Sequence, residues 1–307
     1  MKICFAGLGS IARRHIINLK EIWKDDAEIT VLRSGKGEEA DEEIKRKISR
    51  ICTKPEELEN KYDAVFITNP SSLHYDTLKK FLGYSNAFFI EKPVFVTGRE
   101  EISLFSGLGK IYYAACPLRY SKTIQYLKTN IDFKKVFAIR CICSSYLPEW
   151  RTGTDYRNLY SASRQLGGGV SLDLIHEWDY LVYLTGFPQN VKSMISKKSK
   201  LEIDSDDIAV YIAEYPDKIV EIHLDYFGRK PMRQIELFME DDTITADLNQ
   251  HYIRWMKAEK EVRFTEQRDD YQQAELVHFF KIAAGQTPND NGLETACRML
   301  QTARGEL

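Results

Sequence analysis

Short apolar runs alternate with amphipathic segments over the first 116 residues. The apolar runs predict buried strands at 2–6, 29–32, 48–53, 63–68, 87–92 and 111–115. Apolar residues at helical spacing predict helices at 10–23, 73–82 and near 99–105, and the charged stretch 36–47 is interpreted as a solvated loop and helix face. Because consecutive parallel strands need a crossover connection, this order predicts an α/β domain with a parallel sheet.

Beyond Pro117 the period of the pattern changes. Long segments alternate polar and apolar residues with a period of two, at 135–146, 208–215 and 218–226. Such strands suit a large, mostly antiparallel sheet with one covered face, followed by helices at 267–284 and 292–303. The sequence therefore predicts two domains, an α/β domain at 1–117 and an α+β domain at 118–307.

Composition supports this division and narrows the class of protein. A chain of 307 residues suits two domains at about 150 residues each. With 43% hydrophobic residues and a net charge of −2, it has enough apolar material for a core and no basic excess for nucleic acid. No run approaches the ~20 apolar residues that cross a bilayer, and the first residues lack a secretory pattern. We expect a cytoplasmic protein that binds neither membrane nor nucleic acid.

The cysteines and the acidic and histidine residues of the sequence do not indicate a metal site. The six cysteines occur without CxxC pairs, so they are interpreted as reduced and mostly buried. Glu221, His223 and Asp225 point to one face of a predicted strand, where a solvated or subunit-facing sheet surface is the favoured interpretation over a metal site. No metal is expected.

A glycine motif follows the first predicted strand. In Gly7-Leu8-Gly9-Ser10-Ile11-Ala12, Gly7 permits a tight turn, Gly9 leaves room for a pyrophosphate, and Ala12 lets the helix pack closely on the strand. The N–H groups that open the helix, at Ser10 and Ile11, are donors for phosphate. The setting of strand, turn and helix favours dinucleotide binding over the alternative, an ordinary structural bend.

The end of the second strand bears on cofactor choice. A carboxylate there would hold the ribose hydroxyl of NAD, but the strand runs into Arg33-Ser34. A guanidinium suits a 2′-phosphate because its planar fork bonds phosphate oxygens in a bidentate way. The sequence therefore favours NADP over NAD, with a surface role for Arg33 as the alternative.

Three further stretches, read in order after the glycine motif, resemble the glucose-fructose oxidoreductase and inositol dehydrogenase family, Gfo/Idh/MocA. They are TNPSSLH (68–74), EKP (91–93) and GGGVSLDLIHEWDYL (167–181). The resemblance covers nearly the whole chain. It implies an N-terminal Rossmann domain for the dinucleotide, a C-terminal domain for substrate binding and oligomerisation, and oxidation or reduction of sugars or polyols with NAD(P).

The resemblance also implies roles for individual residues. Lys92 would hydrogen-bond the reacting oxygen, and His176 would be the general acid/base. Asp173 would orient His176 or bind a substrate hydroxyl, and at a spacing of three the two residues are expected on one face of a helix. Many family members have four residues from aspartate to histidine where this chain has three, and Asp179 is the alternative orienting residue. Further residues expected near the cofactor are Thr68, Asn69, Pro70, His74 and Glu91, with a structural role for His74 as the alternative.

Arginines and tyrosines are concentrated at 148–169, a predicted loop over the active site. They could clamp an anionic or heavily hydroxylated substrate. The predicted substrate contacts in this loop are Arg151, Tyr156, Arg157, Tyr160 and Arg164. This stretch and the variant LIHEWDY resemble the branch of the family that acts on amino sugars and nucleotide sugars. The resemblance of PLRY (117–120) to the point where family chains enter the second domain implies Arg119 as a further contact.

We therefore expect an NAD(P)-dependent dehydrogenase or reductase that acts on a CH–OH group of a sugar-like small molecule, working as a homodimer or homotetramer. Two alternatives belong to other classes. A non-catalytic dinucleotide-binding sensor would tolerate replacement of Lys92 and His176. A structural or assembly protein would bind no cofactor at all.

Overall fold

The computed structural model describes residues 1–35 and 41–306, so the predicted loop at 36–40 lies outside the described residues. The chain forms two compact units. Unit 1 comprises Met1–Pro117 and Arg268–Arg298, and unit 2 comprises Leu118–Gln267 and Met299–Leu307. The chain first passes from unit 1 to unit 2 after Pro117, where the sequence predicts a domain boundary. The segment 268–298 was expected in the second domain but belongs to unit 1.

Unit 1 is built on a six-stranded parallel sheet, as the alternating pattern predicted. Its strand order is β3-β2-β1-β4-β5-β6. The bounds are β1 Lys2–Ala6, β2 Glu28–Leu32, β3 Arg50–Cys52, β4 Ala64–Ile67, β5 Ala87–Ile90 and β6 Ile111–Ala114. The strand order reverses beside β1, and in such sheets the carboxyl ends of the strands at the reversal form the ligand crevice.

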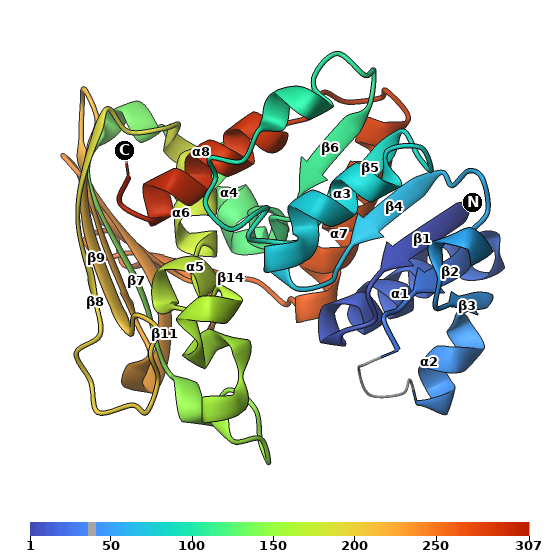
Figure 1. The fold of residues 1–307 in the computed structure, drawn as a ribbon. Coiled ribbons are helices and arrows are strands. Elements are labelled where there is room, and N and C mark those ends of the chain that lie inside the picture. The colour runs from blue at the N-terminus through green and yellow to red at the C-terminus, as the bar shows by residue number, and fades with distance from the viewer. Residues whose placement is uncertain (36–40, 307) are drawn as a thin grey trace. The chain divides into compact units, whose positions relative to one another are not determined.

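The helices of unit 1 come from both ends of the chain (Figure 1). They are α1 Ser10–Trp23, α2 Glu42–Lys47, α3 His74–Phe81, α7 Arg268–Ala283 and the first part of α8 Leu293–Ala303. The helix predicted near 99–105 is only a 3₁₀ turn, Ile102–Phe105. Gly98 and Gly107 have positive φ on either side of it, which leaves too short a segment for a stable α-helix.

Helix α7 completes the core of unit 1. The Phe279 ring packs edge-on against Phe66 and Phe89 of the sheet, with centroids 5.8 and 5.4 Å apart. The Glu275 carboxylate also accepts a hydrogen bond from the backbone of Cys116 at the end of the first segment. These contacts explain why a segment late in the sequence belongs to the first unit.

Unit 2 contains an eight-stranded sheet in the order β14-β13-β12-β11-β7-β10-β9-β8. All its strand pairs are antiparallel except β7 with β10. The bounds are β7 Val136–Tyr146, β8 Asn190–Ser196, β9 Ile208–Glu214, β10 Ile219–Asp225, β11 Phe227–Met239, β12 Thr243–Asp247, β13 Tyr252–Trp255 and β14 Lys260–Arg263. The predicted mostly antiparallel sheet is confirmed.

One face of this sheet is covered by helices of the same unit (Figure 1). They are α4 Lys122–Asn130, α5 Val170–Asp173 and α6 His176–Thr185. Val220, Ile222 and Leu224 of β10 are buried on the covered face, as their alternation predicted, and Trp178 of α6 packs edge-on against Tyr211 of β9.

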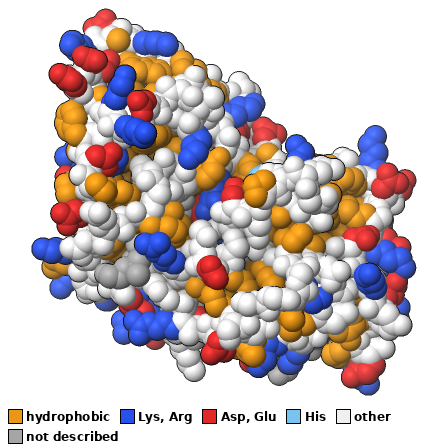
Figure 2. All heavy atoms as spheres, turned by 90° about the horizontal axis from the view of Figure 1, so that it is seen from above, with side chains coloured by type: hydrophobic (Ala, Val, Ile, Leu, Met, Phe, Trp, Pro, Cys, Tyr) orange, Lys and Arg blue, Asp and Glu red, His pale blue; other side chains and the backbone are white. Residues whose placement is uncertain are grey.

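The surface and the cysteines agree with the composition. On the face seen in Figure 2, acidic and basic side chains are intermixed, as a net charge of −2 implies. All six cysteines are buried and unbridged. No helix in the described part of the chain is both long and apolar enough to cross a bilayer.

Candidate active site

The glycine turn of unit 1 connects β1 to α1. Gly7 has φ +108°, and a Cβ there would lie 2.8 Å from the backbone nitrogen of Asn69, so a side chain is excluded by conformation and by space. A Cβ on Gly9 would meet no atom within 4 Å. The first turn of α1 carries no acidic residue, and its N–H groups have no carbonyl within the helix. The turn thus offers open space and a positive helix end to an anion.

Arg33 follows directly on β2 at the same edge of the sheet. The backbone N–H of Gly7 donates to the carbonyl of Leu32 at 2.9 Å, which joins the glycine turn to the residue before Arg33. Arg33 is half-buried, and Ser34 is exposed. A cationic side chain therefore lies at the end of β2, at the position where a carboxylate would bind the ribose hydroxyl of NAD.

Thr68 and Asn69 end the neighbouring strand and support the turn. The Thr68 hydroxyl donates to the carbonyl of Gly7 at 3.1 Å, so its observed contact is to the turn itself. Asn69 donates through its amide to Thr77 at 2.7 Å, while its buried Oδ1 has no hydrogen-bond partner among the described residues. Pro70 is exposed. A buried acceptor without a partner beside an open glycine turn fits a site that a dinucleotide completes.

Glu91 and Lys92 follow β5 at the same edge. The Glu91 backbone N–H donates to the Ile67 carbonyl at 3.0 Å, and Lys92 is half-buried. Lys92 precedes a cis peptide bond to Pro93. Burial opposes ionisation of Glu91, but the hydrogen bond from His15 and the charge of Lys92 lower the pKa of Glu91 below its usual value. The lysine therefore has an ionised carboxylate as its neighbour in sequence.

His74 is a structural residue in this arrangement. It is 1% exposed, and its Nε2 lies 2.8 Å from the Asn69 carbonyl, while Nδ1 lies 3.1 Å from the carbonyls of Pro93 and Val94. Burial lowers the pKa of His74. Both ring nitrogens lie against backbone carbonyls, of the turn after β4 and of the turn after Lys92, which favours the structural alternative over direct cofactor contact.

Asp173 of unit 2 is held by two tyrosines. It is 5% exposed and accepts hydrogen bonds from Tyr226 at 2.5 Å and from Tyr160. Burial and the neighbouring Asp173 charge raise the pKa of both tyrosines. A Cβ on Gly168 would lie 2.1 Å from the Tyr160 carbonyl, so the GGG stretch is what allows Tyr160 to lie so close.

The helix expected to carry both Asp173 and His176 is interrupted. Asp173 is the last residue of α5 and His176 the first of α6. Between them Ile175 donates to the carbonyl of Leu172, a one-turn bond of the tighter 3₁₀ type. The expectation of one continuous helical face is therefore wrong at this point, and the two side chains leave the chain from different helices.

Two arginines anchor the first turn of α6 around His176. The Arg119 guanidinium makes a bidentate pair with Asp179, at 2.9 and 2.7 Å, and Arg233 donates to Glu177 at 2.7 Å. Arg119 and Glu177 are both fully or nearly fully buried. His176 itself is half-buried. Arg119 and Asp179, predicted to contact substrate and to orient His176, form a buried ion pair with each other.

The remaining predicted substrate residues lie in the 3₁₀ turns after β7. Arg157 is exposed and paired with Asp155 and Glu202, and the Tyr156 hydroxyl accepts from the backbone of Glu202 at 3.1 Å. Arg151 is exposed, and Tyr160 is 42% exposed. Of this group, only Tyr160 is joined to Asp173 by a hydrogen bond among the contacts described for it.

Sequence reasoning missed two residues at these sites. His15 bonds Glu91, and Tyr226 bonds Asp173. A signal for His15 was present, because it lies between Ala12 and Leu19 on the buried stripe of α1, where a polar residue needs a partner. Tyr226 falls on the apolar side of the alternating segment 218–226, but nothing in the sequence links its hydroxyl to Asp173.

Unit 1 therefore has the form of a Rossmann dinucleotide-binding domain. Residues 1–106 match a family model described as "Oxidoreductase family, NAD-binding Rossmann fold", GFO_IDH_MocA. This N-terminal part of the chain is similar to the Gfo/Idh/MocA oxidoreductases, as the order of its motifs predicted. No curated protein sequence matches the chain.

Solved structures match the fold over the whole chain. UDP-N-acetylglucosamine 3-dehydrogenase GnnA from Acidithiobacillus ferrooxidans superposes with a TM-score of 0.80 at 19% identity, covering 100% of this chain and 96% of GnnA. The WlbA dehydrogenase from Bordetella pertussis, in complex with NADH and UDP-GlcNAcA, has a TM-score of 0.78 at 16% identity. Myo-inositol 2-dehydrogenase from Lactobacillus plantarum has a TM-score of 0.77 at 17% identity. Both of these also cover 100% of this chain and 96% of their own. These likenesses show the two-part fold.

Proposed function

We propose that this protein is an NAD(P)-dependent dehydrogenase or reductase for a CH–OH group of a sugar-derived substrate, with a nucleotide sugar or amino sugar favoured. The observation that carries the proposal is the edge of the parallel sheet, where the open Gly9 turn, the orphan Asn69 oxygen and Lys92 follow β1, β4 and β5. The names of GnnA and WlbA, both linked to UDP-sugars, support the substrate class.

Proposed roles follow the chemistry of alcohol oxidation. The nicotinamide supplies the two-electron acceptor for the hydride. His176 takes the hydroxyl proton, and Lys92 stabilises the negative charge that develops on the oxygen as the carbonyl forms. Reduction uses the same groups with proton and hydride moving in the opposite direction. Asp173 orients the Tyr160 hydroxyl or binds a substrate hydroxyl.

Cofactor contacts in the proposal come from the edge of the parallel sheet. The N–H groups of Ser10, Ile11 and Ala12 bind the pyrophosphate, and Arg33 with Ser34 binds the 2′-phosphate of NADP. His74, Thr68 and Glu91 hold the residues that make these contacts in place. Because Arg119 forms an ion pair with Asp179, its proposed role is to position α6.

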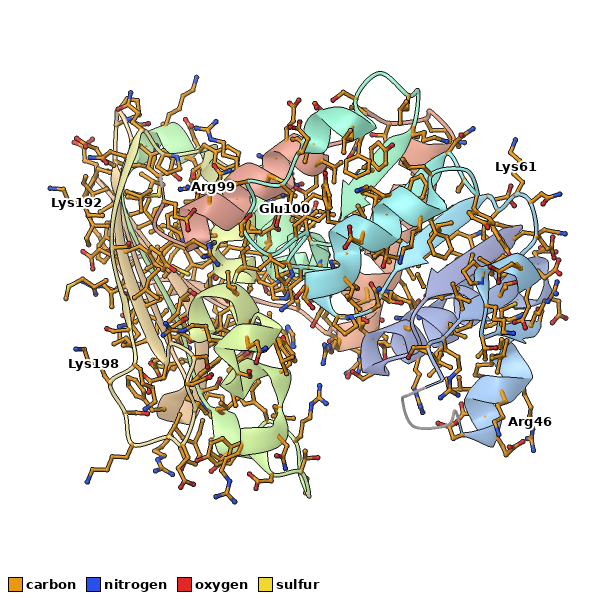
Figure 3. The ribbon with its side chains drawn as sticks, in the orientation of Figure 1. Arg46, Lys61, Arg99, Glu100, Lys192 and Lys198 are labelled. Carbon is orange, nitrogen blue, oxygen red and sulfur yellow. The ribbon has the colours of Figure 1, made fainter. Side chains whose placement is uncertain are left out.

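The proposed assembly is a homo-oligomer joined through the uncovered sheet face of unit 2. Met194, Ile212 and Ile219 of β8, β9 and β10 are 74%, 43% and 42% exposed. Lys192, paired with Ile212, marks the same face and points away from the helices of this unit in Figure 3. Light scattering coupled to gel filtration measures the mass, and a monomer at micromolar concentration contradicts this assembly.

The experiment that tests the function is a fluorescence titration with NADPH and with NADH. Arg33→Ala is expected to weaken NADPH binding about tenfold, the loss of one charge-assisted contact, with NADH binding changed less than about threefold. Arg46→Ala is the matched control, because Figure 3 shows this exposed arginine of α2 pointing outward.

The alternatives are separated by the same protein samples. Binding of neither nucleotide by the wild type contradicts the proposed function and favours a structural role. Binding without turnover of UDP-N-acetylglucosamine or a panel of sugar nucleotides, in either direction, favours the dinucleotide-binding sensor.

A further inference from the structure

A buried hydrogen bond joins the cofactor-binding helix to the turn that carries Lys92. His15 lies in the second turn of α1 and is 1% exposed, and its Nε2 is 2.6 Å from Oε1 of Glu91. The side chain of Glu91 is 13% exposed. A carboxylate only accepts, so the imidazole donates through Nε2.

The position of the His15 ring is fixed by its surroundings. The ring packs edge-on against Phe89 at 5.1 Å and tilted against Phe66 at 5.8 Å, both in the sheet below. Its Nδ1 is buried and has no hydrogen-bond partner among the described residues. Burying a polar ring in apolar surroundings costs free energy. The hydrogen bond to Glu91 is the contact described for His15 that offsets this cost.

Glu91 passes this constraint to Lys92. While Oε1 accepts from His15, Oε2 accepts from the backbone N–H of Lys92 at 3.3 Å. His74 fixes the far side of the same turn through the carbonyls of Pro93 and Val94. The backbone at Lys92 is therefore held between two histidines, one on α1 and one on α3.

We propose that His15 is a positioning residue that, through Glu91, holds Lys92 in place relative to the helix that binds the dinucleotide phosphates. This inference rests on the proposed function for its catalytic meaning. The chemical consequence is that phosphate binding at the start of α1 and the placement of the lysine share one rigid connection.

The test measures Lys92 itself, so that it needs neither cofactor nor substrate. Acetic anhydride labels lysines at pH 8, and mass spectrometry of peptides gives the rate at Lys92 relative to Lys61, an exposed lysine that points outward in Figure 3. His15→Leu removes the donor, so burial favours protonation of Glu91. Lys92 then loses its neighbouring negative charge and its fixed position, and its labelling rate is expected to rise about threefold.

Two variants separate positioning from general packing. His15→Gln keeps an N–H at the position of Nε2 and is expected to restore the wild-type rate within about 1.5-fold. Asn18→Leu is the matched control, because Asn18 is equally buried on α1 but bonds Gln272 of α7 instead of Glu91. It is expected to lower stability and leave the Lys92 rate unchanged.

An unchanged or slower Lys92 rate in His15→Leu overturns the proposal, and so does an equal rise in Asn18→Leu. If His15→Leu does not fold, Glu91→Leu gives the same readout, since it removes both the acceptor for His15 and the charge beside Lys92. Failure of the wild type to bind NADPH or NADH would count against the proposed function alone, because the labelling is done without nucleotide.

Discussion

The two sets of candidate residues are held in different ways. In unit 1 the turn at Lys92 is fixed by the bond from His15 to Glu91 and by the contacts of His74 with backbone carbonyls. In unit 2 the start of α6 is fixed by two buried arginine–carboxylate pairs, at Asp179 and Glu177. The contacts of unit 1 hold a turn that follows a strand of the parallel sheet, whereas the pairs of unit 2 hold the start of a helix.

This difference predicts that changes in the two units act on different measurements. Substitutions at His176 should affect turnover and leave dinucleotide binding unchanged, because the proposed nucleotide contacts all lie in unit 1. His176→Asn is expected to lower the rate by about 10²–10⁴, the usual contribution of a general acid/base. Stopped-flow hydride transfer with the best sugar nucleotide from the panel measures it.

The control for this prediction is binding. The dissociation constant for NADPH should stay within about threefold of the wild type. A loss of NADPH binding in His176→Asn would show that the separation between the units is wrong, and an unchanged rate would remove His176 from the proposed mechanism.

A second contrast concerns stability. Arg119→Met removes one partner of a buried ion pair and leaves the Asp179 carboxylate uncompensated, which typically costs about 3–5 kcal/mol. Denaturant unfolding measures this cost. Arg140→Met is the matched control, because Arg140 is also paired with carboxylates but is half-exposed, and exposed pairs contribute about 0–1 kcal/mol. Equal losses in the two variants would contradict the argument from burial.

The same contrast explains which parts could be predicted from the sequence. Apolar periodicity and the glycine motif predicted the parallel sheet, and the carboxyl ends of its strands then brought Gly7, Thr68 and Lys92 to one edge. The pairing of Arg119 with Asp179 could not be predicted, because 60 positions separate them and neither pattern nor propensity links them.

Local breaks were also beyond the sequence pattern. The stretch from Val170 to Thr185 has enough apolar residues for one helix, yet it divides after Asp173. The side chain of Asp173 bonds Tyr226 at the end of β10, so a tertiary contact helps to decide where the helix ends. Likewise, α7 joins unit 1 through Phe279, a contact that periodicity cannot reveal.

The smallest expected effect tests the support of Lys92 through acid stability. The pKa of Glu91 is lower in the folded protein than its usual value, so Glu91 contributes stability that is fully present above about pH 4.3. That contribution is lost as the pH falls through the folded-state pKa. Glu91→Gln removes the charge but keeps an acceptor for His15, and it should cost about 1 kcal/mol at neutral pH.

The difference between Glu91→Gln and the wild type should therefore shrink as the pH falls from about 4.3 through the lower folded-state pKa of Glu91, below which the carboxylate is protonated in the folded protein as well. Urea unfolding at a series of pH values measures it, with Glu59→Gln as the matched control, since Glu59 makes an exposed pair with Lys2 in the same unit. A difference that stays constant from neutral to acidic pH would mean that Glu91 contributes shape alone. The charge of Glu91 would then contribute nothing to its bond with His15, and packing would hold the turn at Lys92 in place.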